Sequence, residues 1–227
     1  LLVTSNEYNT ANQLVATRDE ALNENSVRRR HVRWRKLWYN GEQMDKHYLS
    51  ANQYQSDMWR LASVIRKSGW KPDFLVGLWR GGAPVAIAVH EYFRATGWNV
   101  QHIPLKCSSY TGIGANNNKV AFLLGDAIFG MFRAGDKVLF VDDVFDTGKT
   151  AAAVMDQMRG IGAEARIACV YWKPEKNQTN IKPDFIAKDI GSEWIVFPHE
   201  IEGLTPEEIR VKDPALADLM AEIESAN

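Results

Sequence analysis

The stretch that decides the fold is KVLFVDDVFDTGKT, residues 137–150. Its four consecutive apolar residues, Val138 to Val141, are typical of a strand that is buried on both faces of a sheet. Two adjacent acids follow, and a short polar turn then leads into a helical pattern. Ligands of open α/β sheets bind at the carboxyl ends of the strands. This stretch therefore predicts a parallel sheet and also the place of its ligand site.

The polar turn at the end of this stretch has the chemistry of an anion site. Backbone N–H groups at a helix start converge on an anion, hydroxyls add donors, and glycine permits close approach of the backbone. We therefore predict that a phosphate binds at Thr147, Gly148, Lys149 and Thr150. The turn also ends like the loop of nucleotide hydrolases, GxxxxGK[ST]. That motif requires glycine at position 143, where this chain has aspartate.

Three acids, Asp142, Asp143 and Asp146, lie beside the predicted phosphate site. Carboxylates repel a phosphate unless they face other groups, and sugar hydroxyls or a metal ion are the natural partners. We expect the first two acids to accept hydrogen bonds from the 2- and 3-hydroxyls of a ribose whose 5-phosphate lies in the turn. A merely polar turn after a strand explains neither the paired acids nor the phosphate loop.

The rest of the chain alternates strand and helix patterns, which is typical of an α/β fold with a mostly parallel sheet covered on both faces by helices. Residues 1–45 are polar and helix-prone, and we expect them to form an N-terminal helical extension. Residues 46–227 are expected to form one domain with a C-terminal helix after Thr205. Helices are expected at 51–68, 83–96 and 150–160, and strands at 73–79, 100–107, 120–124, 137–143, 165–172 and 183–190.

Composition excludes several classes of protein. The 227 residues include 27 Lys+Arg and 28 Asp+Glu, and a formal net charge of −1 argues against binding nucleic acid by bulk charge. Cys107 and Cys169 belong to no CxxC or Cys/His cluster, so neither a disulfide framework nor a zinc site is indicated. No apolar run reaches the length of a membrane span and no secretory signal is evident, so we expect no membrane partner and a cytoplasmic location.

A basic segment, residues 28–36, carries six cations in nine residues, interleaved with His31 and Trp34. A solvated helix face or a subunit contact is one interpretation. Binding to nucleic acid or to an acidic partner is the other, because short basic runs occur in both settings. The sequence leaves these alternatives open.

VLFVDDVFDTGKT, residues 138–150, resembles the phosphoribosyl-pyrophosphate signature of the type I phosphoribosyltransferases along its whole length. Other motifs in the expected order are similar to the 6-oxopurine group, the hypoxanthine, guanine and xanthine phosphoribosyltransferases. These motifs are GLWRGG at 77–82, SSY at 108–110, YWKP at 171–174 and WIVFPHE at 194–200. The resemblance covers roughly residues 50–202. It implies the fold of that family, a mostly parallel central sheet flanked by helices, with a small hood region.

The resemblance implies how phosphoribosyl pyrophosphate is held. Arg80 and Gly81 bind the pyrophosphate leaving group, and the peptide before Arg80 is often cis in this family. Ser109 and Tyr110 begin a lid, running to residue 119, that excludes water. Mg²⁺ is the implied cofactor, bridging diphosphate and ribose oxygens. Its expected ligands are Asp142, Asp143 and Glu200, the last standing where the family usually has aspartate.

The resemblance also assigns the purine side. Asp146 is the candidate general base at N7 of the purine, and Lys173 donates to the exocyclic O6, which favours 6-oxopurines over adenine. Trp194 stacks on the ring, and the backbone of Ile195 reads its Watson–Crick edge. His199 replaces an aromatic residue of the nearest relatives and affects recognition at the 2-position.

The implied activity is transfer of the phosphoribosyl group to N9 of hypoxanthine, guanine or xanthine in purine salvage, by an enzyme that assembles as a homo-oligomer. Two alternatives remain open. One is a regulatory protein that senses phosphoribosyl pyrophosphate and binds nucleic acid through residues 28–36. The other is a transferase for another base.

Overall fold

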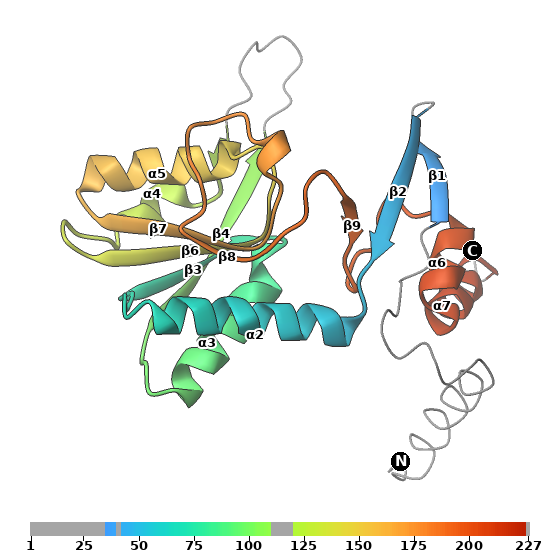
Figure 1. Cartoon of the computed structure of the whole chain (residues 1–227), viewed down its shortest axis with the longest axis horizontal. Helices are drawn as coiled ribbons and strands as arrows, with labels where there is room; N and C mark the ends of the chain where they lie inside the picture. Colours follow the sequence, from blue (N-terminus) through green and yellow to red (C-terminus); the bar gives the residue numbers. More distant parts are fainter. Residues whose placement is uncertain (1–34, 40–41, 110–119, 226–227) are drawn as a thin grey trace, which may run out of the picture. The chain divides into compact units, whose positions relative to one another are not determined.

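The computed structural model describes residues 35–39, 42–109 and 120–225, and within them a six-stranded sheet has the order β5-β4-β3-β6-β7-β8 (Figure 1). All neighbouring strands are parallel except β4 and β5. The apolar run of β6 lies in the middle, where both faces of a strand are buried. The strands are β3 (Phe74–Trp79), β4 (Gln101–Ser109), β5 (Val120–Phe122), β6 (Lys137–Phe145), β7 (Glu164–Trp172) and β8 (Phe185–Asp189).

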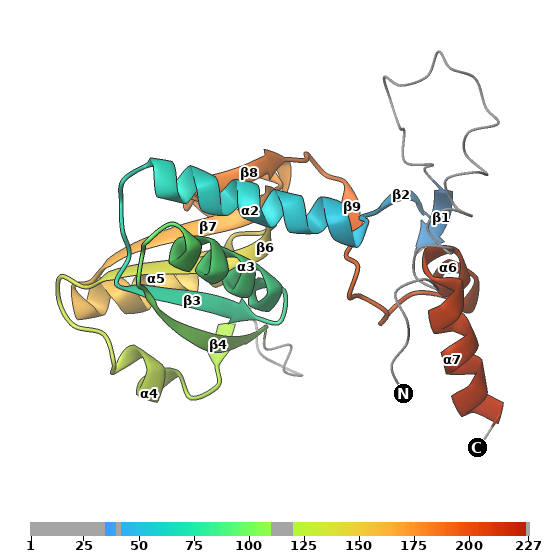
Figure 2. The same cartoon turned by 90° about the horizontal axis from the view of Figure 1, so that it is seen from below.

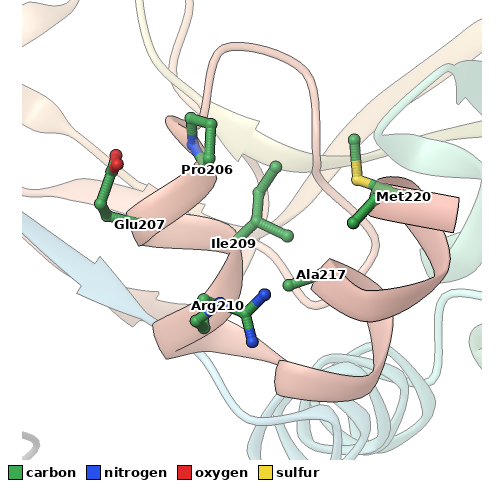
Figure 3. A pocket seen from close by; sticks show the side chains of 7 residues that line it. Pro206, Glu207, Ile209, Arg210, Ala217 and Met220 are labelled. Atoms are coloured by element: carbon green, nitrogen blue, oxygen red, sulfur yellow. The ribbon is translucent and has the colours of Figure 1, made fainter. Parts of the chain in front are cut away.

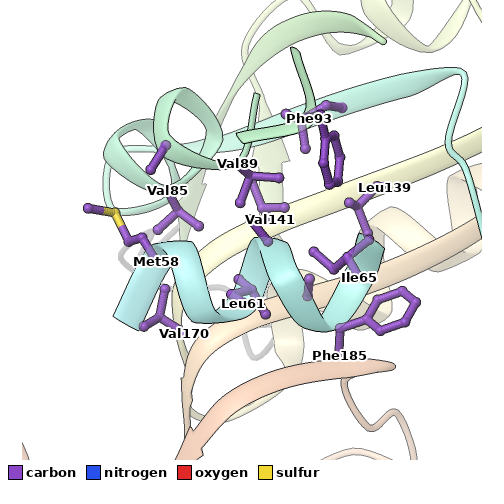
Figure 4. Close-up of a cluster of buried hydrophobic side chains, with 14 of the residues drawn as sticks. Met58, Leu61, Ile65, Val85, Val89, Phe93, Leu139, Val141, Val170 and Phe185 are labelled. Carbon is purple, nitrogen blue, oxygen red and sulfur yellow. The ribbon is translucent and has the colours of Figure 1, made fainter. Parts of the chain in front are cut away.

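Helices cover both faces of this sheet, as the alternating pattern predicts. Helix α2 (Ala51–Lys67) begins at Ser50, whose Oγ accepts the Gln53 backbone N–H, and lies beside α3 (Gly82–Ala95) on one face (Figure 2). Their apolar sides meet the sheet in one buried cluster (Figure 4). The short α4 (Gly125–Phe129) and α5 (Lys149–Ile161) cover the other face with a second cluster. The predicted α/β fold class is confirmed.

A smaller set of elements, which we call the hood, adjoins the carboxyl end of β6. It contains β1 (Arg35–Tyr39), β2 (Glu42–Tyr48), β9 (Trp194–Val196), α6 (Pro206–Lys212) and α7 (Pro214–Ser225). The three strands form a second sheet of order β1-β2-β9, in which β2 and β9 are parallel and Lys46 pairs with Trp194. The elements of the main sheet end near the hood, so the hood provides the second wall of the site described below.

A partly buried ion pair joins β2 to α6 within the hood. Lys46 Nζ lies 2.7 Å from Glu208 Oε1, and the Tyr48 hydroxyl donates to the same oxygen at 3.1 Å. Glu208 also completes a capping box with Thr205 at the start of α6. Burial acts to raise the pKa of Glu208, but the Lys46 ammonium and the other donors outweigh it and hold the pKa below its ordinary value.

The expected helical extension is only partly covered by the described residues. Residues 1–34, with most of the basic segment 28–36, lie outside them. The covered part is strand rather than helix, because residues 35–39 form β1 and residues 42–45 belong to β2. Backbone pairing within a sheet outweighs helix propensity here. None of the helices in the described part of the chain is long and apolar enough to cross a bilayer.

Candidate active site

Two adjacent carboxylates stand near the carboxyl end of β6. The Asp143 backbone N–H donates to Asp142 Oδ1 at 3.0 Å, and the Val144 N–H donates to Asp143 Oδ1 at 2.7 Å. Burial, and then the proximity of Asp143, raise the pKa of Asp142 well above its ordinary value. Burial also raises the pKa of Asp143. Two adjacent buried carboxylates are stabilised in their charged form by a cation or by hydroxyl groups that donate hydrogen bonds to them.

The turn at Arg80 and Gly81, between β3 and α3, lies directly against the Asp143 carboxylate. The Trp79–Arg80 peptide is cis, as the resemblance implied. A Cβ on Gly81 would overlap the Asp143 carboxylate, and one on Gly82 would overlap the carbonyl oxygen of Val141, so both positions require glycine. Arg80 Nη1 lies 3.1 Å from Glu202 Oε2, and both side chains are exposed. An exposed pair is worth about 1 kcal/mol or less, which leaves the guanidinium available to another anion.

The predicted phosphate loop surrounds a cavity of about 100 Å³ at the start of α5. Thr147, Gly148, Lys149 and Thr150 all line it, together with Asp142 and Asp146. Gly148 has φ +75°, and a Cβ there would lie 2.6 Å from Asn177 Oδ1, so this turn too requires glycine. The N-terminus of α5 directs its free backbone N–H groups and its positive dipole end toward such a site.

A second cavity, of about 300 Å³, lies between β6 and the hood. Lys173 is only 8% exposed, and its Nζ lies 3.6 Å from Asp146 Oδ2. Asp146 Oδ1 is buried and has no hydrogen-bond partner among the described residues. Val144 and Asp146 line both cavities, so the two adjoin at these residues. The lining residues of the larger cavity are Asp143, Val144, Asp146, Lys173, Lys176, Ser192, Trp194, Ile195, Phe197 and Glu200.

Comparison with known proteins agrees with this geometry. The family model described as the phosphoribosyl transferase domain matches residues 47–203, more than half of the chain. The chain belongs to this family.

Among curated proteins, a hypoxanthine-guanine phosphoribosyltransferase of Streptococcus agalactiae is 28% identical over 127 residues, 56% of this chain and 67% of that protein. The bifunctional protein PyrR of Corynebacterium diphtheriae is 28% identical over 179 residues, 73% of this chain and 92% of that protein. Both kinds of relative are thus 28% identical to this chain over the residues that they match, and PyrR matches a longer part of it.

Among solved structures, a purine phosphoribosyltransferase from Pyrococcus horikoshii has a TM-score of 0.56 and 28% identity, covering 71% of this chain and 98% of that one. A Neisseria gonorrhoeae protein solved with bound ppGpp has a TM-score of 0.59 at 19% identity, covering 75% of this chain and 97% of that one. The second likeness shows the fold alone.

The three expected metal ligands differ in how many of their carboxylate oxygens are available to a metal ion. Glu200 Oε2 accepts the Phe197 backbone N–H at 3.0 Å, so one of its oxygens is engaged. No group of three or more His, Cys, Asp or Glu side chains is arranged to hold a metal in the described part of the chain. The Asp142–Asp143 pair fits Mg²⁺, which usually binds one or two carboxylates together with substrate oxygens and water.

Only the first residue of the expected lid, Ser109, lies among the described residues. Ser109 is the last residue of β4. Tyr110 and the rest of the lid to residue 119 lie outside the described residues. The roles of Ser109 and Tyr110 therefore stay predictions.

Two buried polar residues of α2 were missed by the sequence reasoning. Asp57 is 1% exposed and accepts from the Tyr171 hydroxyl at 2.7 Å and from Lys188 Nζ at 2.8 Å. Tyr54, one turn earlier, is 4% exposed and packs on Phe197. The available signal was a carboxylate placed next to Met58 on the apolar side of the predicted helix, where an unpaired charge is costly.

A hollow of about 200 Å³ between α6 and α7 is separate from this site (Figure 3). Ile209, Ala217 and Met220 line it from the two helices. None of the residues predicted for the site borders it. The chemistry expected from the sequence is therefore concentrated in the two adjoining cavities at the end of β6.

Proposed function

We propose that this chain transfers the phosphoribosyl group of 5-phosphoribosyl 1-pyrophosphate to N9 of hypoxanthine, guanine or xanthine and releases pyrophosphate, as in purine salvage. The observation that supports it best is the pair of adjoining cavities. The smaller has the donors for a phosphate, the larger has a buried lysine and a tryptophan for a purine, and Asp146 lines both. A ribose bound where the cavities meet would have its hydroxyls at the acid pair, because Asp142 lines the smaller cavity and Asp143 the larger.

In this proposal the sugar phosphate is held at three points. The phosphate lies in the loop of residues 147–150, the ribose hydroxyls donate to Asp142 and Asp143, and the pyrophosphate lies on the turn at Arg80 and Gly81. When Mg²⁺ is bound, Asp142 and Asp143 would hold it, and it would offset the negative charge of the diphosphate. The bond from C1 of ribose to the pyrophosphate oxygen breaks, and Arg80 offsets the charge that develops on the leaving group.

The base is held on the other side of C1. N9 of the purine bonds to C1 as the pyrophosphate leaves, and the proton at N7 passes to Asp146. Lys173 donates to O6, Trp194 stacks on the ring and the backbone of Ile195 reads the edge of the base. A 6-amino group cannot accept from an ammonium, so adenine would leave Lys173 buried without a partner.

The test is a competition assay. The purified protein is given phosphoribosyl pyrophosphate, Mg²⁺ and each of hypoxanthine, guanine, xanthine and adenine, and nucleotide formation is followed by chromatography. We expect product with at least one 6-oxopurine and a much lower rate with adenine. The absence of nucleotide above a no-enzyme control would overturn the proposal. Light scattering of the same sample tests the proposed homo-oligomer.

A second candidate function is regulation through phosphoribosyl pyrophosphate sensing, with nucleic acid bound by residues 28–36. The similarity of this chain to the bifunctional protein PyrR supports this second candidate. Filter binding of RNA at increasing salt distinguishes the two, because neutralised phosphates make affinity fall steeply with salt concentration. Binding that shows this salt dependence, together with no transferase activity, would favour the regulator.

A further inference from the structure

Lys212, the last residue of α6, is a partly buried lysine to which the proposed chemistry assigns no role. Its Nζ donates to the carbonyl oxygen of Phe197 at 2.6 Å and also to the carbonyl oxygen of Glu200. A lysine in the last turn of a helix ordinarily keeps its ammonium in water or near the last carbonyls of its own helix. Lys212 instead binds a segment that lies 12 to 15 residues earlier in the chain.

That segment is a tight turn, residues 197–200, which directly follows β9. The Glu200 backbone N–H donates to the Phe197 carbonyl oxygen at 3.1 Å, and Pro198 stands at the second position, where its fixed φ favours a turn. Glu200 Oε2 in return accepts the Phe197 N–H at 3.0 Å. With Lys212 added, the Phe197 carbonyl oxygen accepts two hydrogen bonds, which is its full capacity.

The turn at 197–200 carries part of the wall of the larger cavity. Phe197 and Glu200 both line that cavity, together with Trp194 and Ile195 of β9. The His199 ring packs against the Phe197 ring, with the two centroids 5.7 Å apart. Lys212 is not one of the residues that line the cavity. Its contact with the cavity is therefore indirect and passes through the turn.

We propose that Lys212 is a positioning residue for purine recognition, whose ammonium holds the turn at 197–200 in the conformation in which Phe197 lines the site of the base. This role rests on the proposed function. Bonds from an ammonium to carbonyl oxygens are stronger than bonds between neutral groups, so Lys212 fixes the turn more firmly than its own backbone bond does. Lys212 acts through the turn and touches neither the base nor a reacting atom.

The test is Lys212→Met, which removes the ammonium and keeps an unbranched side chain. We expect KM for the purine to rise about tenfold, the effect of losing one charge-assisted hydrogen bond. KM for phosphoribosyl pyrophosphate should change less than about twofold, because both hydrogen bonds of Lys212 go to the turn and neither to the loop at 147–150. Lys212→Arg should restore most of KM for the purine, since a guanidinium can donate to both carbonyls.

Hydrogen exchange, followed by mass spectrometry on the whole protein, measures the turn itself. In Lys212→Met the backbone amides of residues 197–200 should exchange faster, while those of β6 should exchange as in the wild type. Exchange that is unchanged at the turn would contradict the proposal, because the turn would then be held without Lys212.

Two other variants of α6 are controls. Arg210→Met removes a cation from the same helix whose partner is the exposed Asp218, and it should change neither KM. Glu208→Gln weakens the pairing of α6 with Lys46 but removes no donor to the turn, so KM for the purine should stay near that of the wild type.

The outcomes separate this role from the proposed function. If the wild type is active and Lys212→Met keeps the same KM for the purine, the role of Lys212 is overturned and the proposed function stands. If Lys212→Met raises KM for both substrates alike, or if Glu208→Gln raises KM for the purine as much, Lys212 is only structural and the proposal is wrong. If the wild type forms no nucleotide, both proposals fail.

Discussion

Replacement of Lys173 by methionine removes a buried ammonium from the larger cavity and keeps the length of the side chain. Lys173 is 8% exposed and its Nζ is 3.6 Å from Asp146 Oδ2, so in this structure the ammonium makes an ion pair longer than a hydrogen bond. A substrate oxygen that accepts from Lys173 therefore gains a charge-assisted bond worth about 1.5–3 kcal/mol. At about 1.4 kcal/mol per factor of ten, kcat/KM for 6-oxopurines should fall about 10-fold to 100-fold.

The assay measures kcat/KM for hypoxanthine, guanine, xanthine and adenine at fixed phosphoribosyl pyrophosphate and Mg²⁺. Adenine should be used as well as before or better, because methionine leaves no unpaired charge against its 6-amino group. Lys176→Met is the matched control, since Lys176 lines the same cavity but is exposed, and its effect should be small and equal for all bases. An equal fall for adenine and the 6-oxopurines would refute the assignment of Lys173 to O6.

Three further substitutions and one control substitution test the site and the hood. Asp146→Asn should lower kcat about 100-fold or more with little change in KM for phosphoribosyl pyrophosphate, as for loss of a general base, and steady-state kinetics with kcat within tenfold of wild type would contradict that role. Gly148→Ala should raise that KM and lower the melting temperature, because the position has φ +75° and a Cβ there meets the covering loop. Gly160→Ala in α5 is the control, because a Cβ there meets nothing within 4 Å, and it should leave the melting temperature unchanged or raise it. If Gly160→Ala and Gly148→Ala shifted the melting temperature equally, the requirement for glycine at 148 would be wrong. Glu208→Gln should lower the free energy of unfolding at pH 7 by about 1–3 kcal/mol in urea titrations, because Lys46 loses its charged partner. Since the folded pKa of Glu208 lies below its ordinary value, this contribution is complete above about pH 4.3 and is lost as the pH falls through the folded pKa. As the pH falls through that range, the free energy of unfolding should therefore decrease less in the variant than in the wild type. If the two proteins lost the same free energy of unfolding, the Lys46–Glu208 pairing would not be supported.

Local signals account for the elements that the sequence predicted well. Ser50 and the helical spacing of Met58, Leu61 and Ile65 predicted a helix, and α2 runs from Ala51 to Lys67 with those three side chains buried. The apolar run of β6 likewise predicted a central strand, because only a strand covered on both faces keeps four consecutive apolar residues from water.

Pairing between distant segments accounts for what the sequence did not predict. Residues 42–45 were expected in a helical extension, yet they belong to β2, which pairs with β9 near the other end of the chain. Nothing in the local pattern of either segment identifies the other. A strand of three residues such as β9 is too short for alternation to be recognised.

The same distinction applies to the candidate site. The acids at 142 and 143 and the loop at 147–150 follow one another in sequence, so a common site could be predicted from their spacing. The structure places Asp142 and the loop around one cavity. Asp57 depends on Lys188, which is 131 residues away. Tyr54 depends on Tyr171 of β7 and on Phe197, which follows β9. Only the folded chain shows that these side chains meet.

The pairing of β2 with the end of the chain has a consequence for the order in which this protein matures during synthesis. All strands of the main sheet lie before residue 190, whereas Lys46 meets Glu208 only after a separation of 162 residues. A growing chain therefore completes the main sheet and the loop at residues 147–150 before it gains the hood residues that wall the larger cavity. A chain that stopped before β9 would keep the smaller cavity but would lack Trp194, Ile195, Phe197 and Glu200 from the wall of the larger one.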